Sequence, residues 1–232
     1  MSTMEAQNKK KGNARERILE LAEESVLAKG FQATSIDELI AGAGITKSGF
    51  FYHFKDKTEL ARSLLVRYIE REQTLFDDLF FRADVLNEDP LHGFLVGLKM
   101  LAEMLSDLPS GHPGCLIASY CYQERLFDQQ VRDLNAEAVL AWRRRFRERL
   151  DRIAARYPSR TAVDLDDLAD MLSAVVDGAS SCPRRSGTAR RCRGRSYSIA
   201  SSCVPSSQPH KQSDDFRRES AGFWHFFPCR VD

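Results

Sequence analysis

Leucine is missing from the last part of this chain: residues 179–232 contain none, whereas residues 1–178 contain 24. The same final segment holds 11 serines, nine arginines and four of the six cysteines. Its ten basic and four acidic residues give a net charge of +6, which leaves −5 for the rest of the chain. Because such a segment can bury little apolar surface, it is expected to be a low-complexity, largely disordered tail.

The change in composition falls inside a helical pattern over residues 164–177, where Gly178 is the only stop signal. We therefore hypothesise that residues 179–232 are translated in a shifted frame relative to an ancestral gene. An amphipathic, leucine-containing continuation in a neighbouring frame would support this hypothesis, and its absence from both frames would reject it. A basic arm that contacts phosphate or RNA is the functional alternative.

Other features are scarce as well. Glycine (13) and proline (8) are modest in number, strand-like alternation is rare, and helix formers dominate the first three quarters, which favours an all-α fold. The apolar stretch Phe94–Leu105 is interrupted by Lys99 and Glu103, so no membrane span is expected. Residues 1–12 are polar and lysine-rich, which predicts a disordered arm rather than a secretory signal, and a cytoplasmic protein.

Catalytic and metal-binding patterns are also missing. The sequence has no nucleophile-base set and no phosphate-cradling glycine loop, and the aspartate pairs at 77–78 and 166–167 project from different sides of a helix. Cys115 and Cys121 lie six residues apart, which is not a zinc spacing. We expect buried thiols there, with a redox sensor as the alternative. An enzyme, a metal and a cofactor are therefore not expected.

Three helices near the N-terminus each begin with a pattern that resembles a capping box, in which a polar residue precedes a glutamate by three positions. The first helix is expected to run from residue 13 to Lys29, where Gly30 ends it. The three pairs are Asn13 with Glu16, Ser35 with Glu38 and Asp56 with Glu59.

The second and third helices form a predicted helix-turn-helix. The second spans 35–43, Gly44 allows a tight reversal, and Thr46 can cap a short third helix over 47–54. Phe50 and Phe54 share the core side of that helix by their i,i+4 spacing. An ordinary helical hairpin is the alternative interpretation.

The outer side of the third helix suits a DNA major groove. Lys47, Ser48 and Tyr52 can face outward there, and free N–H groups at the helix start can bind phosphate. Lys47 and Lys57 are placed to hold the DNA backbone. A packed Tyr52 ring and a helix-terminal His53 without contact to DNA are the alternatives.

The stretch from Thr34 to Leu60 closely resembles the DNA-binding signature of the TetR/AcrR family, over about residues 13–65. The resemblance implies a DNA-binding head (13–60), a helical effector-binding and dimerisation body (61–178) and a homodimer. Ser48 and Phe51 stand where the family more often has Gly and Tyr. The predicted DNA contacts, with Lys47 added from its position, are Thr34, Thr46, Lys47, Ser48, Gly49, Tyr52, His53 and Lys57.

The body is rich in aromatic and flexible apolar side chains, which either fill a core or line a cavity for a small molecule. The family usually pairs through its last two helices, of which only the stretch 164–177 is recognisable here, so dimer formation is in doubt. The predicted effector contacts are Phe76, Phe94, Met104, Tyr120, Phe127 and Trp142. The predicted dimer contacts are Leu165, Leu168 and Leu172.

We therefore expect a regulator that binds double-stranded DNA, blocks transcription and is released by a small-molecule effector of unknown class. A monomeric or misassembled remnant of such a regulator is the first alternative. A helical binding protein or enzyme that carries a three-helix head is the second. No membrane partner is expected.

Overall fold

The computed structural model describes residues 3–106, 114–159 and 162–180, and within these ranges it contains eight α-helices, one short 3-10 helix and no strand. The predicted all-α fold is confirmed. The predicted tail, apart from the end of the last helix, lies outside the described residues. The elements are α1 (Thr3–Lys29), α2 (Ile36–Ala43), α3 (Lys47–His53), α4 (Lys57–Leu86), α5 (Pro90–Ser106), α6 (Leu116–Tyr122), η1 (Glu124–Leu126), α7 (Gln129–Arg156) and α8 (Leu165–Ser180).

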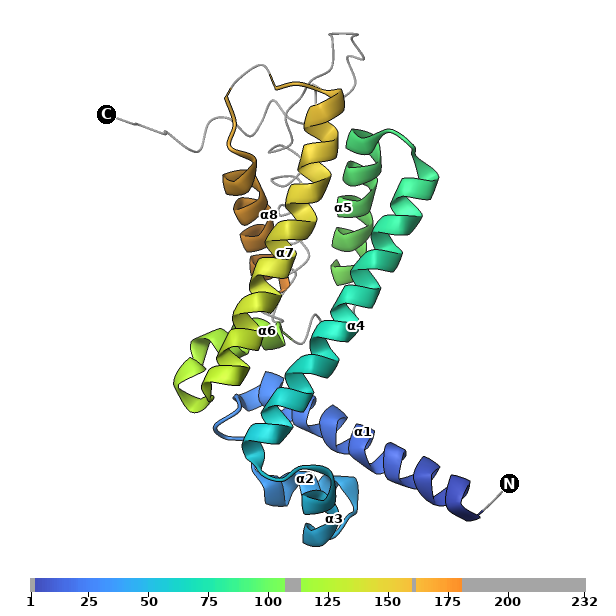
Figure 1. Ribbon diagram of the computed structural model, residues 1–232, viewed down its shortest axis with the longest axis vertical. Coiled ribbons are helices and arrows are strands. Elements are labelled where there is room, and N and C mark those ends of the chain that lie inside the picture. Colours follow the sequence, from blue (N-terminus) through green and yellow to red (C-terminus); the bar gives the residue numbers. More distant parts are fainter. Residues whose placement is uncertain (1–2, 107–113, 160–161, 181–232) are drawn as a thin grey trace.

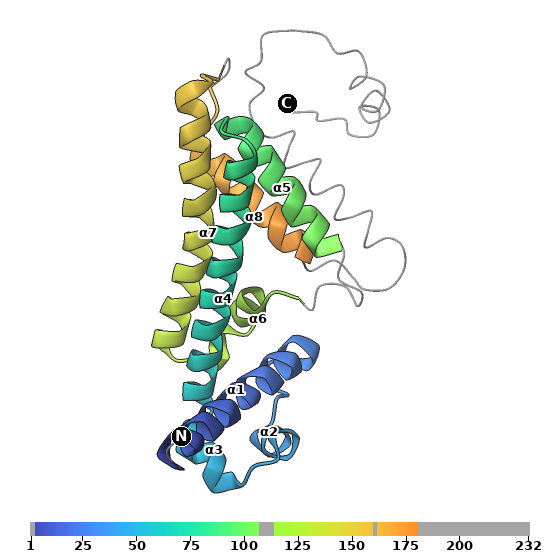
Figure 2. The ribbon, with the colours of Figure 1, turned by 90° about the vertical axis from the view of Figure 1, so that its right-hand side faces the viewer.

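The helices form a head and a body along the long axis of the molecule. α1, α2 and α3 lie together at one end, and α4 leads away from them into the body (Figure 1). α5 packs against the distal part of α4, α7 runs beside α4, and α8 packs against α7 (Figure 2). In the described parts of the chain, no helix is both long enough and apolar enough to cross a bilayer.

The first helix begins earlier than predicted. α1 starts at Thr3, so the expected disordered arm over residues 1–12 is wrong for residues 3–12, and Asn13 lies inside the helix rather than capping it. Residues 3–12 contain no proline and consist largely of strong helix formers, which allows the helix to continue through them. The predicted end is confirmed, because Gly30 adopts φ 84° and its N–H donates to the carbonyl of Val26 at 2.8 Å.

The other two predicted helix starts are confirmed. The Ser35 hydroxyl accepts the Glu38 N–H at 3.2 Å, and Asp56 Oδ1 accepts the Glu59 N–H at 2.8 Å. Glu59 Oε2 in turn accepts the N–H of Lys55 at 2.7 Å, so this helix start has bonds in both directions. Each cap is expected to contribute about 1 kcal/mol to stability.

Buried side chains form two clusters. The lower core joins the head to the near part of the body, and the upper core lies between α4, α5, α7 and α8. Since the lower core continues past residue 60, the head is not packed as a separate unit. The lower core includes Ile18, Leu19, Phe50, Phe54, Leu60, Leu64, Leu116, Tyr120 and Phe127, and the upper core includes Phe76, Phe80, Phe94, Leu101, Phe146, Leu150, Leu168 and Leu172.

Candidate nucleic-acid interface and internal cavity

The turn between α2 and α3 has little freedom. Gly44 adopts φ 64°, a left-handed conformation that favours glycine, and its N–H donates to the carbonyl of Ala41 at 3.2 Å. The Thr46 hydroxyl caps α3 by accepting the Gly49 N–H at 3.1 Å and also bonds the Ser48 hydroxyl at 3.0 Å. A Cβ on Gly49 would lie 3.3 Å from Thr46 Oγ1, so a larger residue would crowd this cap.

α3 has the two faces that the sequence predicts. Phe50 and Phe54 are fully buried in the lower core, with ring centroids 5.6 Å apart. On the other side Lys47 and Ser48 are exposed, and Tyr52 is 66% exposed. The buried rings therefore fix the helix from behind while its outer side stays open to solvent.

The prediction that Thr34 contacts DNA needs a correction, because its side chain is buried and cannot reach DNA. Only 1% of the residue is exposed. Its hydroxyl donates to the carbonyl of Gly30 at 3.0 Å and bonds the Ser25 hydroxyl at 3.0 Å. Thr34 therefore fixes the loop between α1 and α2.

The Lys57 side chain already makes contacts within the head. Its Nζ donates to the carbonyl of Gln32 at 3.3 Å and lies 4.7 Å from the centre of the Phe31 ring, and partial burial lowers the pKa of its ammonium group. His53 is half-buried, and its ring centre lies 5.0 Å from that of Tyr52. Lys55, which the sequence analysis missed, is exposed between α3 and α4. Its position in the sequence, just before the Asp56 helix cap and outside the helix, could have indicated that its side chain is exposed.

The short helix α6 connects the body to the head. The Tyr120 hydroxyl donates to the carbonyl of Ala61 at 2.9 Å, and the Gln32 N–H donates to Gln123 Oε1 at 3.3 Å. Tyr120 and Phe127 stack with ring centroids 4.3 Å apart inside the lower core. The prediction that these two rings contact an effector is therefore wrong, because they pack between the head and the body.

Ion pairs hold α1 beside α4. Arg67 of α4 lies 2.9 Å from Glu16, 3.7 Å from Glu20 and 3.3 Å from Glu23, all on α1. Arg71 also bonds Glu23, whose side chain is only 12% exposed. Glu23 is the most buried carboxylate of this cluster, and exposed pairs of this kind contribute up to about 1 kcal/mol each.

A cavity of about 590 Å³ lies between the two cores. Of the six predicted effector contacts, Phe76, Met104 and Trp142 line it. Phe94 is fully buried in the upper core and does not, so that prediction is wrong. Other apolar side chains in its wall are Leu75, Leu101, Leu105, Ile117, Val139, Leu140 and Val176.

The cavity also contains carboxylates, which the sequence analysis missed. Glu72 of α4 receives hydrogen bonds from the Tyr68 hydroxyl and the Trp142 indole N–H. Burial above all, with a smaller contribution from the Asp177 carboxylate, nevertheless raises the pKa of Glu72 to about 7. Glu72 follows Tyr68 by four positions, one turn along the same helix, and the helical spacing alone does not mark such a glutamate as inward-facing.

Residues 18–64 match the family model described as bacterial regulatory proteins, tetR family. The N-terminal head belongs to the TetR family. A curated relative, an uncharacterized HTH-type transcriptional regulator named YdgC from Bacillus subtilis (strain 168), is 24% identical over 100 residues. That match covers 43% of this chain and 51% of the relative, so the chain spans about half the length of the curated relative it matches.

Solved structures agree with the TetR-family assignment at the level of the fold. A TetR-family regulator from Agrobacterium tumefaciens superposes with a TM-score of 0.70 at 18% identity, covering 84% of this chain and all of that one (100%). A TetR regulator from Chloroflexus aurantiacus J-10-FL gives 0.70 at 21% identity, covering 86% and 98%. The head thus matches a family of bacterial regulatory proteins, and the overall fold matches solved structures of TetR-family regulators.

Cys115 does not resemble a reactive thiol. Burial raises the pKa of the Cys115 thiol to about 12, and its sulfur accepts the Ala118 N–H at 3.4 Å. A protonated thiol is a poor nucleophile, which argues against redox sensing at this residue. Cys121 is exposed and also lines the cavity. Over the described ranges, no group of three or more His, Cys, Asp or Glu side chains could hold a metal ion.

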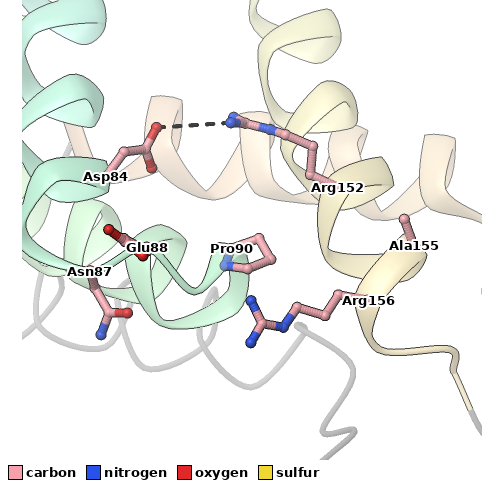
Figure 3. A pocket seen from close by; sticks show the side chains of 7 residues that line it. All are labelled: Asp84, Asn87, Glu88, Pro90, Arg152, Ala155 and Arg156. Atoms are coloured by element: carbon pink, nitrogen blue, oxygen red, sulfur yellow. Dashed lines mark ion pairs between the residues drawn. The ribbon is translucent and has the colours of Figure 1, made fainter.

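A second hollow lies at the far end of the body, between the tips of α4 and α7 (Figure 3). Arg152 lies 3.9 Å from Asp84, and Arg156 lies 3.4 Å from Asp89. Asp89 also bonds the Tyr157 hydroxyl, and these partners hold the pKa of its carboxyl below the usual range although its own burial raises it. The charged groups here pair across the hollow and tie the helix ends together.

The predicted dimer contacts need a correction. Leu168 and Leu172 are 4% and 0% exposed, because α8 directs them into the upper core of its own chain. Leu165 is partly buried against the same core. On α8 the side chain of Met171 is 41% exposed. The leucine stripe that suggested an interface is therefore the stripe that packs α8 onto the body.

Proposed function

We propose that this protein is a transcriptional regulator that inserts α3 into the major groove of an operator. The exposed side of α3, held from behind by Phe50 and Phe54, is the observation that supports this most strongly. A recognition helix needs this combination, since its outer residues must reach base edges while its inner residues fix its position.

The proposed DNA contacts divide by chemistry. Tyr52 and Ser48 face base edges and sugars, and Lys47 faces phosphate. Thr46 and Gly49 present the helix start, where small residues permit close approach to the DNA backbone. His53 and Lys57 lie at the edge of this surface, and Lys55 adds an exposed cation beside them.

The assembly we propose is a cytoplasmic homodimer on a near-palindromic operator, with half-sites about 34–36 Å apart. Repression follows from occupation of the promoter. A small molecule in the cavity releases the DNA if it prefers a conformation of α4 and α6 that changes the separation of the heads. α6 suits this role because Ile117 faces the cavity while Tyr120 bonds α4 near the head.

Duplex binding tests the proposal. The protein is titrated against tiled fragments of its own upstream DNA at two salt concentrations, together with the variants Tyr52→Ala and Lys47→Ala. We expect Tyr52→Ala to weaken binding to the preferred fragment about tenfold or more. We expect Lys47→Ala to reduce the slope of log K against log salt concentration by about one. Tyr122→Ala is the matched control, because Tyr122 is 86% exposed and lies in the body.

Sedimentation of the same samples gives the stoichiometry. Two chains per preferred duplex would support the dimeric regulator. A monomer that binds all fragments equally, with Tyr52→Ala indistinguishable from Tyr122→Ala, would favour the misassembled remnant instead.

A further inference from the structure

We propose that the cavity between the two cores binds an organic cation with an apolar body, and that its positive centre lies near Glu72. This inference rests on the proposed function only in taking the cavity as the effector site. It goes further by naming the chemical class of the effector.

The charges in the cavity wall favour a cation. Among the residues that the structure describes, Glu72, Asp170 and Asp177 bring carboxylates to the cavity wall, and Arg143 brings a cationic side chain. Arg143 is already held between two aspartates, with Nε 3.0 Å from Asp170 and an Nη 3.7 Å from Asp166. Because Arg143 is ion-paired in this way, it is less available to an anionic ligand than an unpaired cation would be.

Glu72 is placed to receive the positive centre. Tyr68 and Trp142 donate hydrogen bonds to it, so its carboxylate is fixed before a ligand arrives. Neither donor carries a charge, and Arg71, the nearest cation on the same helix, bonds Glu23 of α1. A partly buried carboxylate whose hydrogen-bond donors are neutral gains from a cation brought by a ligand.

The remainder of the wall suits an apolar and aromatic body. Phe76 and Trp142 meet edge to face with ring centroids 4.2 Å apart, and the Tyr122 ring also borders the cavity. Aromatic faces attract cations as well as burying apolar surface. The volume of about 590 Å³ lies in the range of pockets that hold drug-sized ligands.

Charge-matched probes test this proposal by calorimetry on the full chain. Tetraphenylphosphonium and tetraphenylborate have nearly the same shape and opposite charge, and decyltrimethylammonium and decanoate form a slimmer, flexible pair. We expect the cation of at least one pair to bind about tenfold or more tightly than its anionic partner. Equal binding, anion preference or no binding of either pair by the folded protein would overturn the proposal.

Variants locate the site. Glu72→Gln keeps the size of the side chain and removes its charge, so it is expected to lower cation affinity about tenfold while leaving the anion affinity unchanged or higher. Glu70→Gln is the matched control, because Glu70 is an exposed residue on the same helix. If Glu70→Gln and Glu72→Gln lose cation affinity equally, the preference comes from the overall surface charge and the proposal fails.

The same samples separate this inference from the proposed function. Cation binding without any effect on the preferred duplex would contradict effector release while leaving the ligand class intact. Sequence-specific duplex binding by a protein that shows no cation preference would overturn the ligand class and leave the DNA-binding function standing.

Discussion

The lower core and the cavity above it are built by some of the same helices but differ in how their interior is used. In the lower core, rings such as Phe54 and Tyr120 pack side by side and the Tyr120 hydroxyl is bonded to α4. One turn beyond Tyr68 on the same α4, Glu72 faces a space of about 590 Å³. In the proposed mechanism the filled region would transmit a change of shape between body and head, whereas the hollow region would respond to a ligand.

The largest effect is expected from removing a ring of the lower core. Phe54→Ala should destabilise the protein by about 3–5 kcal/mol, because a fully buried aromatic ring leaves a cavity. Since the lower core continues from head to body, both should unfold in one transition, which chemical denaturation followed by tyrosine and tryptophan fluorescence would detect. Phe81→Ala, at a 67% exposed position, is the control and should change little. A separate early transition of the head would contradict a continuous core.

A smaller effect is expected from titration of Glu72. The pKa of the Glu72 carboxyl is about 7 in the folded protein and 4.5 in the unfolded chain. Between these two pH values the folded protein therefore binds a proton on Glu72 that the unfolded chain has released. Stability should therefore fall by about 1–3 kcal/mol as the pH rises from about 4.5 to 7. Glu72→Gln should lose this part of the pH dependence in denaturation curves, whereas Glu70→Gln should keep it. The titratable and charged groups that face Glu72 are Tyr68, Arg71, Cys115 and Asp177.

In this pH range the neighbours of Glu72 do not compete for the proton. Burial raises the pKa of Tyr68 and of Cys115 well above the interval, so both stay protonated. Parallel curves for the wild type and Glu72→Gln across the interval would show that Glu72 is hydrated rather than held in a poorly hydrated site.

The smallest effect is expected from Tyr120→Phe, which removes only the hydroxyl that bonds the Ala61 carbonyl. The loss should be about 0.5–1.5 kcal/mol, because the ring stays in place and one hydrogen bond is lost. Hydrogen exchange should show faster opening of amides near Ala61 than of those near Phe146 in the upper core. Uniform acceleration in both cores would argue against a local link through α6.

The head was predicted well because its signals are local. Ser35, Thr46 and Asp56 each bond a backbone N–H three residues ahead, and helical spacing alone places Phe50 and Phe54 on one side. The exception is Thr34, whose burial depends on Ser25 and Gly30 rather than on its neighbours in the motif. A motif indicates which residues stand together in sequence, but not which of their side chains face inward.

The body was predicted less well because its site depends on contacts between distant helices. An aromatic ring in a helix has the same sequence pattern whether it fills a core, as Phe94 does, or lines a cavity, as Trp142 does. The leucines of α8 lie on one side of the helix, but their spacing does not indicate whether that side packs on the body of the same chain or on a second chain. Glu72 escaped notice because its surroundings come from α7 and α8, more than 60 residues further along the chain.

The glutamates beside Arg67 have a mechanical consequence. Glu16, Glu20 and Glu23 follow one another at about one helical turn, which is close to 5.4 Å along α1. If α4 slides a short way along α1, the Arg67 guanidinium keeps at least one of these carboxylates within reach. If α4 lifts away from α1, all three pairs are lost together. These ion pairs therefore oppose separation of the two helices more than sliding, whereas the buried packing of Ile18 and Leu64 in the lower core opposes both movements.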